Sequence, residues 1–317
     1  MVLLLASMLL PALAAANEKD AHAWLERMIR AVRTLSYEGT FVYLRGGHLE
    51  SIRIVHSFEG GEERERLLSL NGSPRMVNRD QAAIVCIMPD VHDVSIEKRS
   101  NRLGIPVLST LGGERFPEQY LLRILGQARI AERESVVIGV IPKDDYRYGY
   151  RLYLDKVTAL PLKLDLMDES AKPIEQVMFT ALRIFPRQAG EDVAAPLSDE
   201  RSRAVAGKEK PTNPALKWRF KMLPPGFSVE AAGELENEEG NKVEHLVVTD
   251  GFAAVSIYIE PSPVHGKSLL GSTNIGAVNA WGGVVDGFQV TAVGEVPRKT
   301  IREIVAAMDH TAVASAQ

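Results

Sequence analysis

Cysteine is almost absent from this sequence of 317 residues. Its single cysteine, Cys86, lies in the apolar run AAIVCIMP. One cysteine cannot form an intramolecular disulfide, so the fold has to be held together without covalent cross-links. We interpret Cys86 as a small apolar side chain within a strand.

Motifs of catalysis and cofactor binding are missing as well. The sequence contains no G-x-S-x-G, P-loop, G-x-G-x-x-G, H-E-x-x-H or C-x-x-C pattern. Its seven histidines lie in separate segments, none paired at the spacing of a metal site. The acidic pair Asp144-Asp145 is typical of a solvated turn, because acid–base chemistry would need a cleft around it. We therefore predict no enzyme, no metal and no cofactor.

A strong net charge is also absent. The formal net charge is −4, and lysine and arginine are scattered among acidic residues rather than gathered in a stripe. Nucleic-acid-binding proteins usually carry a basic surface, so this charge pattern argues against a nucleic-acid partner. The apolar content of 45% and charged content of 25% are ordinary for a soluble globular protein.

The N-terminus lacks an apolar run long enough to cross a bilayer. The run VLLLASMLLPALAAA is too short for a membrane span and ends in small residues. It is typical of a secretory signal, so residues 1–16 are predicted to be removed on export. The run departs from the usual pattern because no basic residue follows Met1, and it contains no cysteine for a lipid anchor.

After the predicted signal, apolar residues recur first at helical spacing and then at every second position. DAHAWLERMIRAVRTLS has apolar residues at helical spacing and predicts an amphipathic helix with Asp20 as its N-cap. A period of two then predicts a series of strands, with hairpin turns at Gly46-Gly47 and Gly60-Gly61. The segment FPEQYLLRIL is predicted to be a short second helix that opens at Pro117.

These elements predict the domain organisation. The strands are joined by short connections, which favours antiparallel pairing, so residues 17–186 are expected to form a large antiparallel sheet that curls into an unclosed β-barrel. Residues 187–214 are rich in proline, alanine and charge and predict a linker. Residues 215–317 predict a small α+β domain whose last helix, RKTIREIVAAM, buries Ile301, Ile304, Val305 and Met308.

One predicted strand has an unusual face. In YRYGYRLYLDK, the residues Tyr146, Tyr148, Tyr150, Leu152 and Leu154 point to the same side, because side chains alternate along a strand. Tyrosine has an apolar body and a polar tip, which suits either a core or the wall of a wet cavity. The sequence leaves both interpretations open.

The second domain contains a similar ambiguity. The segment LPPGFSV fixes a rigid turn at Pro225 and presents Phe227 after it. Trp218 precedes this turn, and Trp281 lies in NAWGGVVDGFQ. These four residues either fill the core of the small domain or anchor a partner chain, since rigid aromatic residues often carry interfaces.

Several of these segments resemble one family. LSYEGTFVY, DDYRYGYRLYLD, LPLKLDLMDE and EQVMFTALRI in the first domain, and WRFKMLPPGF, VTDGFAAVSIYIEP and VGEVP in the second, are similar to the RseB/MucB family. The resemblance follows the same order along nearly the whole mature chain. It implies a periplasmic negative regulator of the sigma-E envelope-stress response with a LolA/LolB-like first domain.

The resemblance also implies partners and sites. The small domain would contact the periplasmic part of an RseA- or MucA-type anti-sigma factor and shield it from site-one proteolysis, and a lipid or lipopolysaccharide-type ligand would release it. The expected ligand-binding residues are Tyr37, Phe41, Tyr43, Tyr146, Tyr148 and Tyr150. The expected partner-binding residues are Trp218, Pro225, Phe227 and Trp281. A LolA-like carrier of lipid or lipoprotein is the alternative, disfavoured because a carrier needs no second domain, and the sequence leaves a homodimer open.

Overall fold

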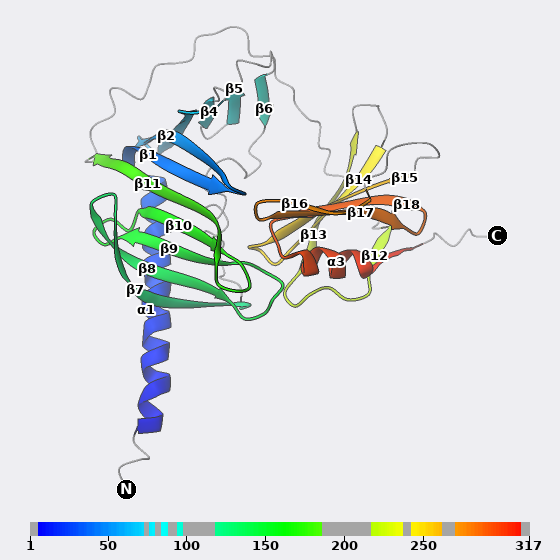
Figure 1. Cartoon of the computed structure of the whole chain (residues 1–317), viewed down its shortest axis with the longest axis horizontal. Helices are drawn as coiled ribbons and strands as arrows, with labels where there is room; N and C mark the ends of the chain where they lie inside the picture. Colours follow the sequence, from blue (N-terminus) through cyan, green and yellow to red (C-terminus); the bar gives the residue numbers. More distant parts are fainter. Residues whose placement is uncertain are drawn as a thin grey trace, which may run out of the picture.

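The computed structural model describes residues 6–72, 76–79, 84–87, 94–97, 118–185, 217–236, 242–261 and 270–311 (Figure 1). These residues form two separate antiparallel sheets, each with a helix against it, and a short two-stranded sheet. The predicted linker, residues 187–214, lies outside the described residues.

The large sheet contains eleven strands. Their order is β6-β5-β4-β3-β2-β1-β11-β10-β9-β8-β7, and the outer strands β6 and β7 are not paired with each other. The sheet is therefore not closed, and the predicted unclosed antiparallel barrel is confirmed. The strands are β1 (Ser36–Arg45), β2 (His48–Glu59), β3 (Glu62–Ser69), β4 (Met76–Arg79), β5 (Ile84–Ile87), β6 (Val94–Glu97), β7 (Tyr120–Ile130), β8 (Arg133–Pro142), β9 (Gly149–Asp155), β10 (Pro161–Met167) and β11 (Pro173–Phe185).

Turn residues of this sheet adopt the conformations that the sequence suggested. Gly46-Gly47 joins β1 to β2 and Gly60-Gly61 joins β2 to β3, all with positive φ, where glycine is favoured. Cys86 lies in β5, so its placement in a strand is confirmed.

Helix α1 (Ala6–Thr34) packs against this sheet through Ala21, Leu25 and Met28, which join a core cluster with strand residues. The prediction of Asp20 as an N-cap is wrong. Asp20 is an exposed residue inside α1, because alanine and leucine before it favour continuation of the helix. Within the described part of the chain, no helix is long and apolar enough to be a candidate membrane span.

The predicted second helix is also wrong. The residues from Tyr120 onward lie instead at the start of β7, which pairs with β8 along its whole length, while Phe116 and Pro117 lie outside the described residues. Tyr120 and Leu122 are buried, whereas Arg123 is exposed, so the segment follows a period of two. Periodicity alone does not separate a helix from a strand in so short an apolar run, and pairing with β8 decides the outcome.

The second sheet contains six strands in the order β13-β14-β15-β18-β17-β16, and a short sheet pairs β12 with β19. Helix α3 (Arg298–Ala306) follows Pro297 and buries Ile301, Ile304 and Val305 as predicted, while Met308 is buried just beyond the helix. The strands are β12 (Trp218–Phe220), β13 (Ser228–Glu236), β14 (Lys242–Thr249), β15 (Ala254–Pro261), β16 (Gly271–Ile275), β17 (Val278–Val285), β18 (Phe288–Gly294) and β19 (Met308–His310).

The β16–β17 hairpin was not foreseen from the sequence. It is short and rich in glycine and small residues, so it lacks the apolar alternation that marks a strand. The hairpin nevertheless completes the predicted small α+β domain. Figure 1 shows its turn next to the strand ends of the large sheet.

Candidate functional site

The face that carries the tyrosines has two different ends. Leu152 and Leu154 are fully buried and share a core cluster with Leu25 and Met28 of α1. Tyr148 and Tyr150 belong to the same cluster, but Phe252 from the β14–β15 turn of the second domain also belongs to it. The strand therefore packs on a helix at its leucine end and meets the second domain at its tyrosine end.

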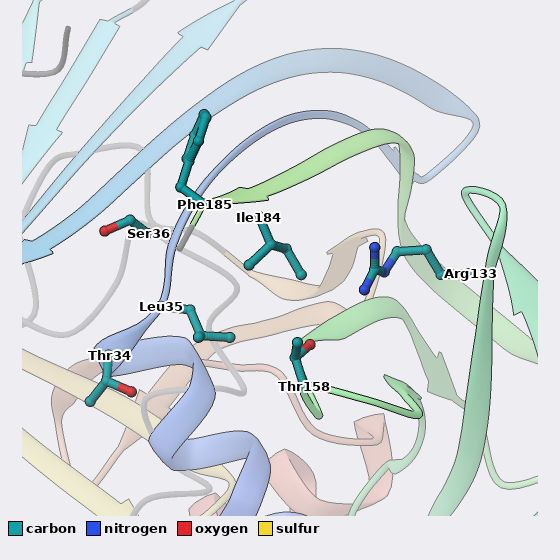
Figure 2. A pocket seen from close by; sticks show the side chains of 7 residues that line it. All are labelled: Thr34, Leu35, Ser36, Arg133, Thr158, Ile184 and Phe185. Atoms are coloured by element: carbon teal, nitrogen blue, oxygen red, sulfur yellow. The ribbon is translucent and has the colours of Figure 1, made fainter. Parts of the chain in front are cut away.

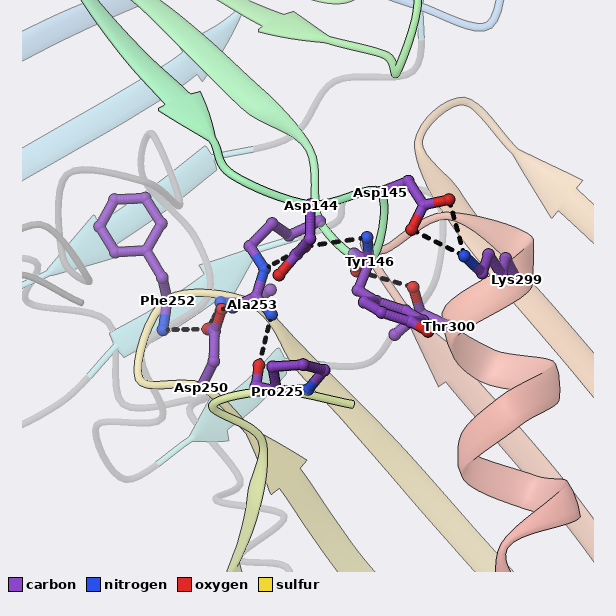
Figure 3. A network of polar contacts seen from close by, with 10 residues as sticks. Asp144, Asp145, Tyr146, Pro225, Asp250, Phe252, Ala253, Lys299 and Thr300 are labelled. Carbon is purple, nitrogen blue, oxygen red and sulfur yellow. Dashed lines mark hydrogen bonds and ion pairs between the residues drawn. The ribbon is translucent and has the colours of Figure 1, made fainter. Parts of the chain in front are cut away.

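Arg147 hydrogen-bonds to groups of both domains, and Figure 3 labels three of these partners, Asp144, Pro225 and Asp250. Its guanidinium is fully buried and donates to the carboxylates of Asp144, at 2.9 Å, and Asp250. It also donates to the carbonyl of Pro225 at 2.6 Å, and it lies over the ring of Phe227 at 5.0 Å. We call Arg147, Asp144, Asp250 and the Pro225 carbonyl the Arg147 cluster.

The electrostatics of this cluster follow from burial. Burial raises the pKa of the Asp250 carboxyl, while the backbone N–H groups of Ala253 and Phe252 and the Arg147 guanidinium act in the opposite direction. The carboxylate holds the β14–β15 turn, because its Oδ1 accepts from those two backbone N–H groups at 2.6 and 2.8 Å. A buried charge is tolerated only when it is paired and hydrogen-bonded, as it is here.

The N-terminal turn of α3 forms a second contact. Lys299 pairs with Asp145 at 2.6 Å, and the hydroxyl of Thr300 donates to the carbonyl of Tyr146 at 2.7 Å. The ammonium of Lys299 also lies 4.4 Å from the centre of the Tyr146 ring. The hydrogen bond from Lys299 is the main reason that the pKa of Asp145 is lowered.

A third contact involves the β16–β17 hairpin. The backbone N–H of Ala277 donates to Glu175 Oε1 at 2.8 Å, and the Tyr43 hydroxyl donates to the other carboxylate oxygen at 2.5 Å. Gly276 has a φ of +58°, and a Cβ atom there would lie 2.4 Å from atoms of Arg45 and Glu175. Only glycine allows this close approach.

Asn279 links the third contact to the tyrosine face. Its amide donates to the hydroxyl of Tyr148 at 3.0 Å and to the carbonyl of Val296 at 2.8 Å. Burial raises the pKa of Tyr148 to about 12, so the phenol stays protonated at neutral pH. Tyr150 contacts Phe252 edge to face, with 5.7 Å between the ring centres.

The remaining ligand-binding candidates lie elsewhere. Tyr37 and Phe41 are buried in a separate cluster on β1, where both contact the ring of Phe179 edge to face. Tyr37 also stacks on His56 at 4.9 Å. The structure thus brings Tyr43, Tyr146, Tyr148 and Tyr150 to the domain contact but not Tyr37 or Phe41. Lipid binding by any of the six stays a prediction.

The four partner-binding candidates occupy different environments. Trp218 and Phe227 are buried in the core of the second domain, and Trp281 is a partly buried residue that packs against that core. Trp218 contacts the rings of Phe288 and His310. The Pro225 ring is exposed, while its carbonyl belongs to the Arg147 cluster. Partner binding by these residues stays a prediction.

A cavity of about 520 Å³ opens where α1 meets β1 (Figure 2). Apolar side chains contribute most of its wall, and Arg133 and three hydroxyl groups supply the polar part. Arg133 is held by Asp155, with the Arg133 Nε 2.7 Å from the carboxylate. The lining residues are Thr34, Leu35, Ser36, Arg133, Thr158, Ile184 and Phe185. No group of three or more metal-ligating side chains was found in the described residues.

The main residues of the domain contact were missed by sequence reasoning. Asp145 is exposed as expected for a turn, but Asp144 is half-buried and holds Arg147. Asp250 lies 103 residues beyond Arg147 in the sequence, and the Pro225 carbonyl lies 78 residues beyond it. A local pattern cannot show pairings at such separations. The local signal that could have pointed to this contact is Arg147, which lies between two tyrosines and close to Asp144 and Asp145 in the sequence.

Comparison with known proteins connects both domains to one family. The model of the MucB/RseB N-terminal domain matches residues 20–201, and that of the MucB/RseB C-terminal domain matches residues 212–309. The sigma factor AlgU regulatory protein MucB of Pseudomonas aeruginosa is 32% identical over 99% of this chain and 98% of its own length. The sigma-E factor regulatory protein RseB of Escherichia coli is 26% identical over 96% and 95%.

A solved structure agrees with this assignment. The crystal structure of MucB in complex with MucA(peri) is 30% identical, covers 92% of this chain and 100% of its own, and superposes with a TM-score of 0.70. The relatives are regulatory proteins, which confirms the prediction of a protein that is not an enzyme. The matches span both domains, so this chain belongs to the MucB/RseB family of sigma-factor regulatory proteins.

Proposed function

We propose that this chain is a periplasmic negative regulator of an extracytoplasmic-function sigma factor. It binds the periplasmic part of a transmembrane anti-sigma factor and shields that protein from site-one proteolysis. A lipid or lipopolysaccharide-type amphiphile releases it. In this proposal residues 1–16 are a signal peptide, residues 17–186 hold the amphiphile, and residues 215–317, joined by the linker 187–214, provide partner surface.

The observation that carries the proposal is the extent of the similarity. The relative MucB was crystallised with MucA(peri), and its likeness to this chain extends through both sheets. A carrier of lipid or lipoprotein would require only the large domain, whereas the second domain of this chain also matches the family. This difference favours the regulator over the carrier.

The geometry supports coupling between amphiphile and partner. Tyr148 and Tyr150 contact Asn279 and Phe252 of the second domain, so an amphiphile that reached these tyrosines would compete with the domain contact. The cavity beside Leu35 and Phe185 is a second place where an acyl chain would find apolar surface. A ligand at the tyrosines would act directly on the small domain, whereas the residues that line the cavity all belong to the large domain.

The first experiment measures partner binding. The mature full-length chain is titrated by calorimetry with a peptide that carries the periplasmic part of MucA, and we expect saturable binding. Cleavage of the same peptide by its site-one protease should be slower in the presence of the chain. A peptide that binds without being protected would remove the shielding role, and a peptide that does not bind would remove the proposal.

The second experiment measures release. An acylated, phosphorylated glycolipid is titrated at fixed peptide, and the peptide is then titrated at fixed glycolipid. Linkage requires the same factor in both directions, and a change of about 5- to 150-fold is typical of such coupling. Equal glycolipid affinity with and without saturating peptide would show that the chain is a constitutive shield.

A further inference from the structure

Within the described residues, strand β16 is an edge strand with no charged residue of its own, although Arg298 hydrogen-bonds to the side chain of Asn274. It is the last strand of the six-stranded sheet, and all five of its residues are exposed. An edge strand presents unpaired backbone groups, and proteins normally protect such edges with charged residues or bulges. The sequence of β16 is Gly-Ser-Thr-Asn-Ile, which has no charge, and its register with β17 has no shift.

The far edge of the same sheet and the β7 edge of the large sheet are protected. Strand β13, at the far side of the same sheet, carries Glu230 and Glu234 and has a register shift between Val229 and Ala231. Strand β7, at the edge of the large sheet, exposes Arg123 and Arg129 and also has a register shift. Among these three edges, β16 alone has neither charge nor bulge.

Exposed apolar side chains accompany this edge. Leu270 and Ile275, at the two ends of β16, are 71% and 70% exposed. Next to Ile275, the turn at Gly276 lies against the β1–β2 turn, where a methyl group added at Gly46 would lie 3.4 Å from the Gly276 nitrogen. Leu44 and Leu49 face each other across that β1–β2 hairpin and are exposed as well. Exposed apolar side chains therefore lie in both domains near the boundary, with Arg45 and Glu175 at the contact itself.

We infer that β16 is the docking edge for an extended segment of the anti-sigma factor, which pairs with it as an added strand. Main-chain hydrogen bonds to an exposed edge give affinity, and alternate side chains of the added strand give specificity. Apolar residues of the segment would cover Ile275 at the domain boundary. This inference rests on the proposed function, which supplies a peptide partner.

The occupant is a peptide segment rather than a second copy of the chain. A specific, stable complex of two folded proteins usually buries about 1,200–2,000 Å². An edge of five residues offers much less to a rigid partner. An extended peptide can follow the edge and continue across the domain boundary toward the β1–β2 turn. Because Gly276 lies at the contact between the domains, a change in their arrangement would alter this docking surface. Release of the partner by a ligand of the large domain requires such a dependence.

The test compares two exposed apolar residues. Ile275→Asp places a charge beside the edge, and Val157→Asp places the same charge on a 79% exposed residue in the β9–β10 turn of the large domain. We expect Ile275→Asp to weaken calorimetric binding of the MucA periplasmic peptide by about tenfold or more, as loss of one buried apolar side chain implies. Val157→Asp should bind as the unmodified chain does.

A proline pair tests the strand pairing itself. In an antiparallel ladder, neighbouring residues direct their N–H groups alternately toward β17 and toward the open edge. Of Ser272→Pro and Thr273→Pro, one therefore keeps the ladder to β17 and loses only an outward donor. That variant should keep the melting temperature of the unmodified chain and bind the peptide more weakly. If the variant that keeps its melting temperature also binds normally, the inference is wrong.

Hydrogen exchange distinguishes the remaining outcomes. Peptide should slow exchange of amides in 271–275 and leave those in 228–236 unchanged. Normal peptide binding without protection of 271–275 would overturn the docking edge and leave the proposed function intact. Protection of 271–275 that rises with protein concentration in the absence of peptide would assign the edge to a second copy and overturn the inference. Absence of peptide binding by the unmodified chain would overturn both.

Discussion

The two ends of the segment from Tyr146 to Leu154 are buried in different ways. The leucines of the first end are fully buried in a core cluster that also contains Leu25 and Met28 of α1. The tyrosine end is buried against the second domain, and its partners are the amide of Asn279 and the ring of Phe252. The first end stabilises one domain, whereas the second holds two domains together.

The two ends differ in how strictly their packing depends on the positions of the groups opposite them. Apolar burial is non-directional, so Leu152 and Leu154 need only a matching shape opposite them. The Arg147 cluster requires particular oxygens at particular positions, and the removal of one charge leaves another buried without its partner. The polar end therefore favours one placement of the domains, while the apolar end contributes non-directional burial.

We expect the largest loss of stability when the ion pairs of Arg147 are removed. Arg147→Met removes a fully buried cation and leaves Asp250 without its partner. Breaking a buried ion pair in this way usually costs about 3–5 kcal/mol. Urea unfolding followed by tryptophan fluorescence would measure the loss, with Trp24 reporting the first domain and Trp218 and Trp281 the second. The double variant Arg147→Met/Asp250→Asn should recover part of it, and a double variant as unstable as the single one would contradict this account.

The apolar end should be nearly as sensitive. Leu152 is fully buried and lies opposite Ile138 on β8 and Leu164 on β10. Leu152→Ala should reduce the free energy of unfolding by about 2–5 kcal/mol through lost burial and a new cavity. The exposed Val157, changed to alanine, is the control and should alter stability by no more than about 0.5 kcal/mol. Similar urea midpoints for the two variants would place Leu152 outside the core.

A pH experiment tests the leucine end of the segment through Asp155, the last residue of β9. Burial acts to raise the pKa of Asp155, but hydrogen bonds from Arg133 and Thr158 outweigh it, so this pKa lies below its usual value. The stability that Asp155 contributes is therefore present above the unfolded pKa of about 3.9 and is lost as the pH falls through the lower folded value. Asp155→Asn should lower stability at neutral pH and flatten the loss in acid. An unchanged acid profile would assign that loss to other groups.

The smallest effect is expected at the Tyr148 hydroxyl. Tyr148→Phe removes one hydrogen bond from Asn279, and the Asn279 amide keeps the carbonyl of Val296 as an acceptor. A single neutral hydrogen bond contributes about 0.5–1.5 kcal/mol. The urea midpoint should therefore shift slightly while the spectrum of the folded chain is unchanged. A loss as large as that of Leu152→Ala would mean that the ring itself moves.

Much of the fold follows from local patterns in the sequence. The apolar alternation in β9 and β11, the glycine turns and the spacing of Ile301, Ile304 and Val305 in α3 each depend on neighbours a few residues away. These periods arise from the geometry of a single helix or strand. The resemblance of several segments indicated the family, and these periods made the fold class and the final helix predictable. The short apolar run at Tyr120 was not, because pairing with β8 made it a strand.

The sequence by itself determined which faces are apolar, that no disulfide holds the fold, and that the chain has antiparallel domains of this family. Only the tertiary structure decided what the tyrosine face touches. Arg147 meets Asp250 and Pro225 across long stretches of chain, and β16 becomes an edge only once the order of six strands is known. The physical reason is that side-chain alternation assigns a residue to a face, whereas the group opposite that face is chosen by the packing of distant segments.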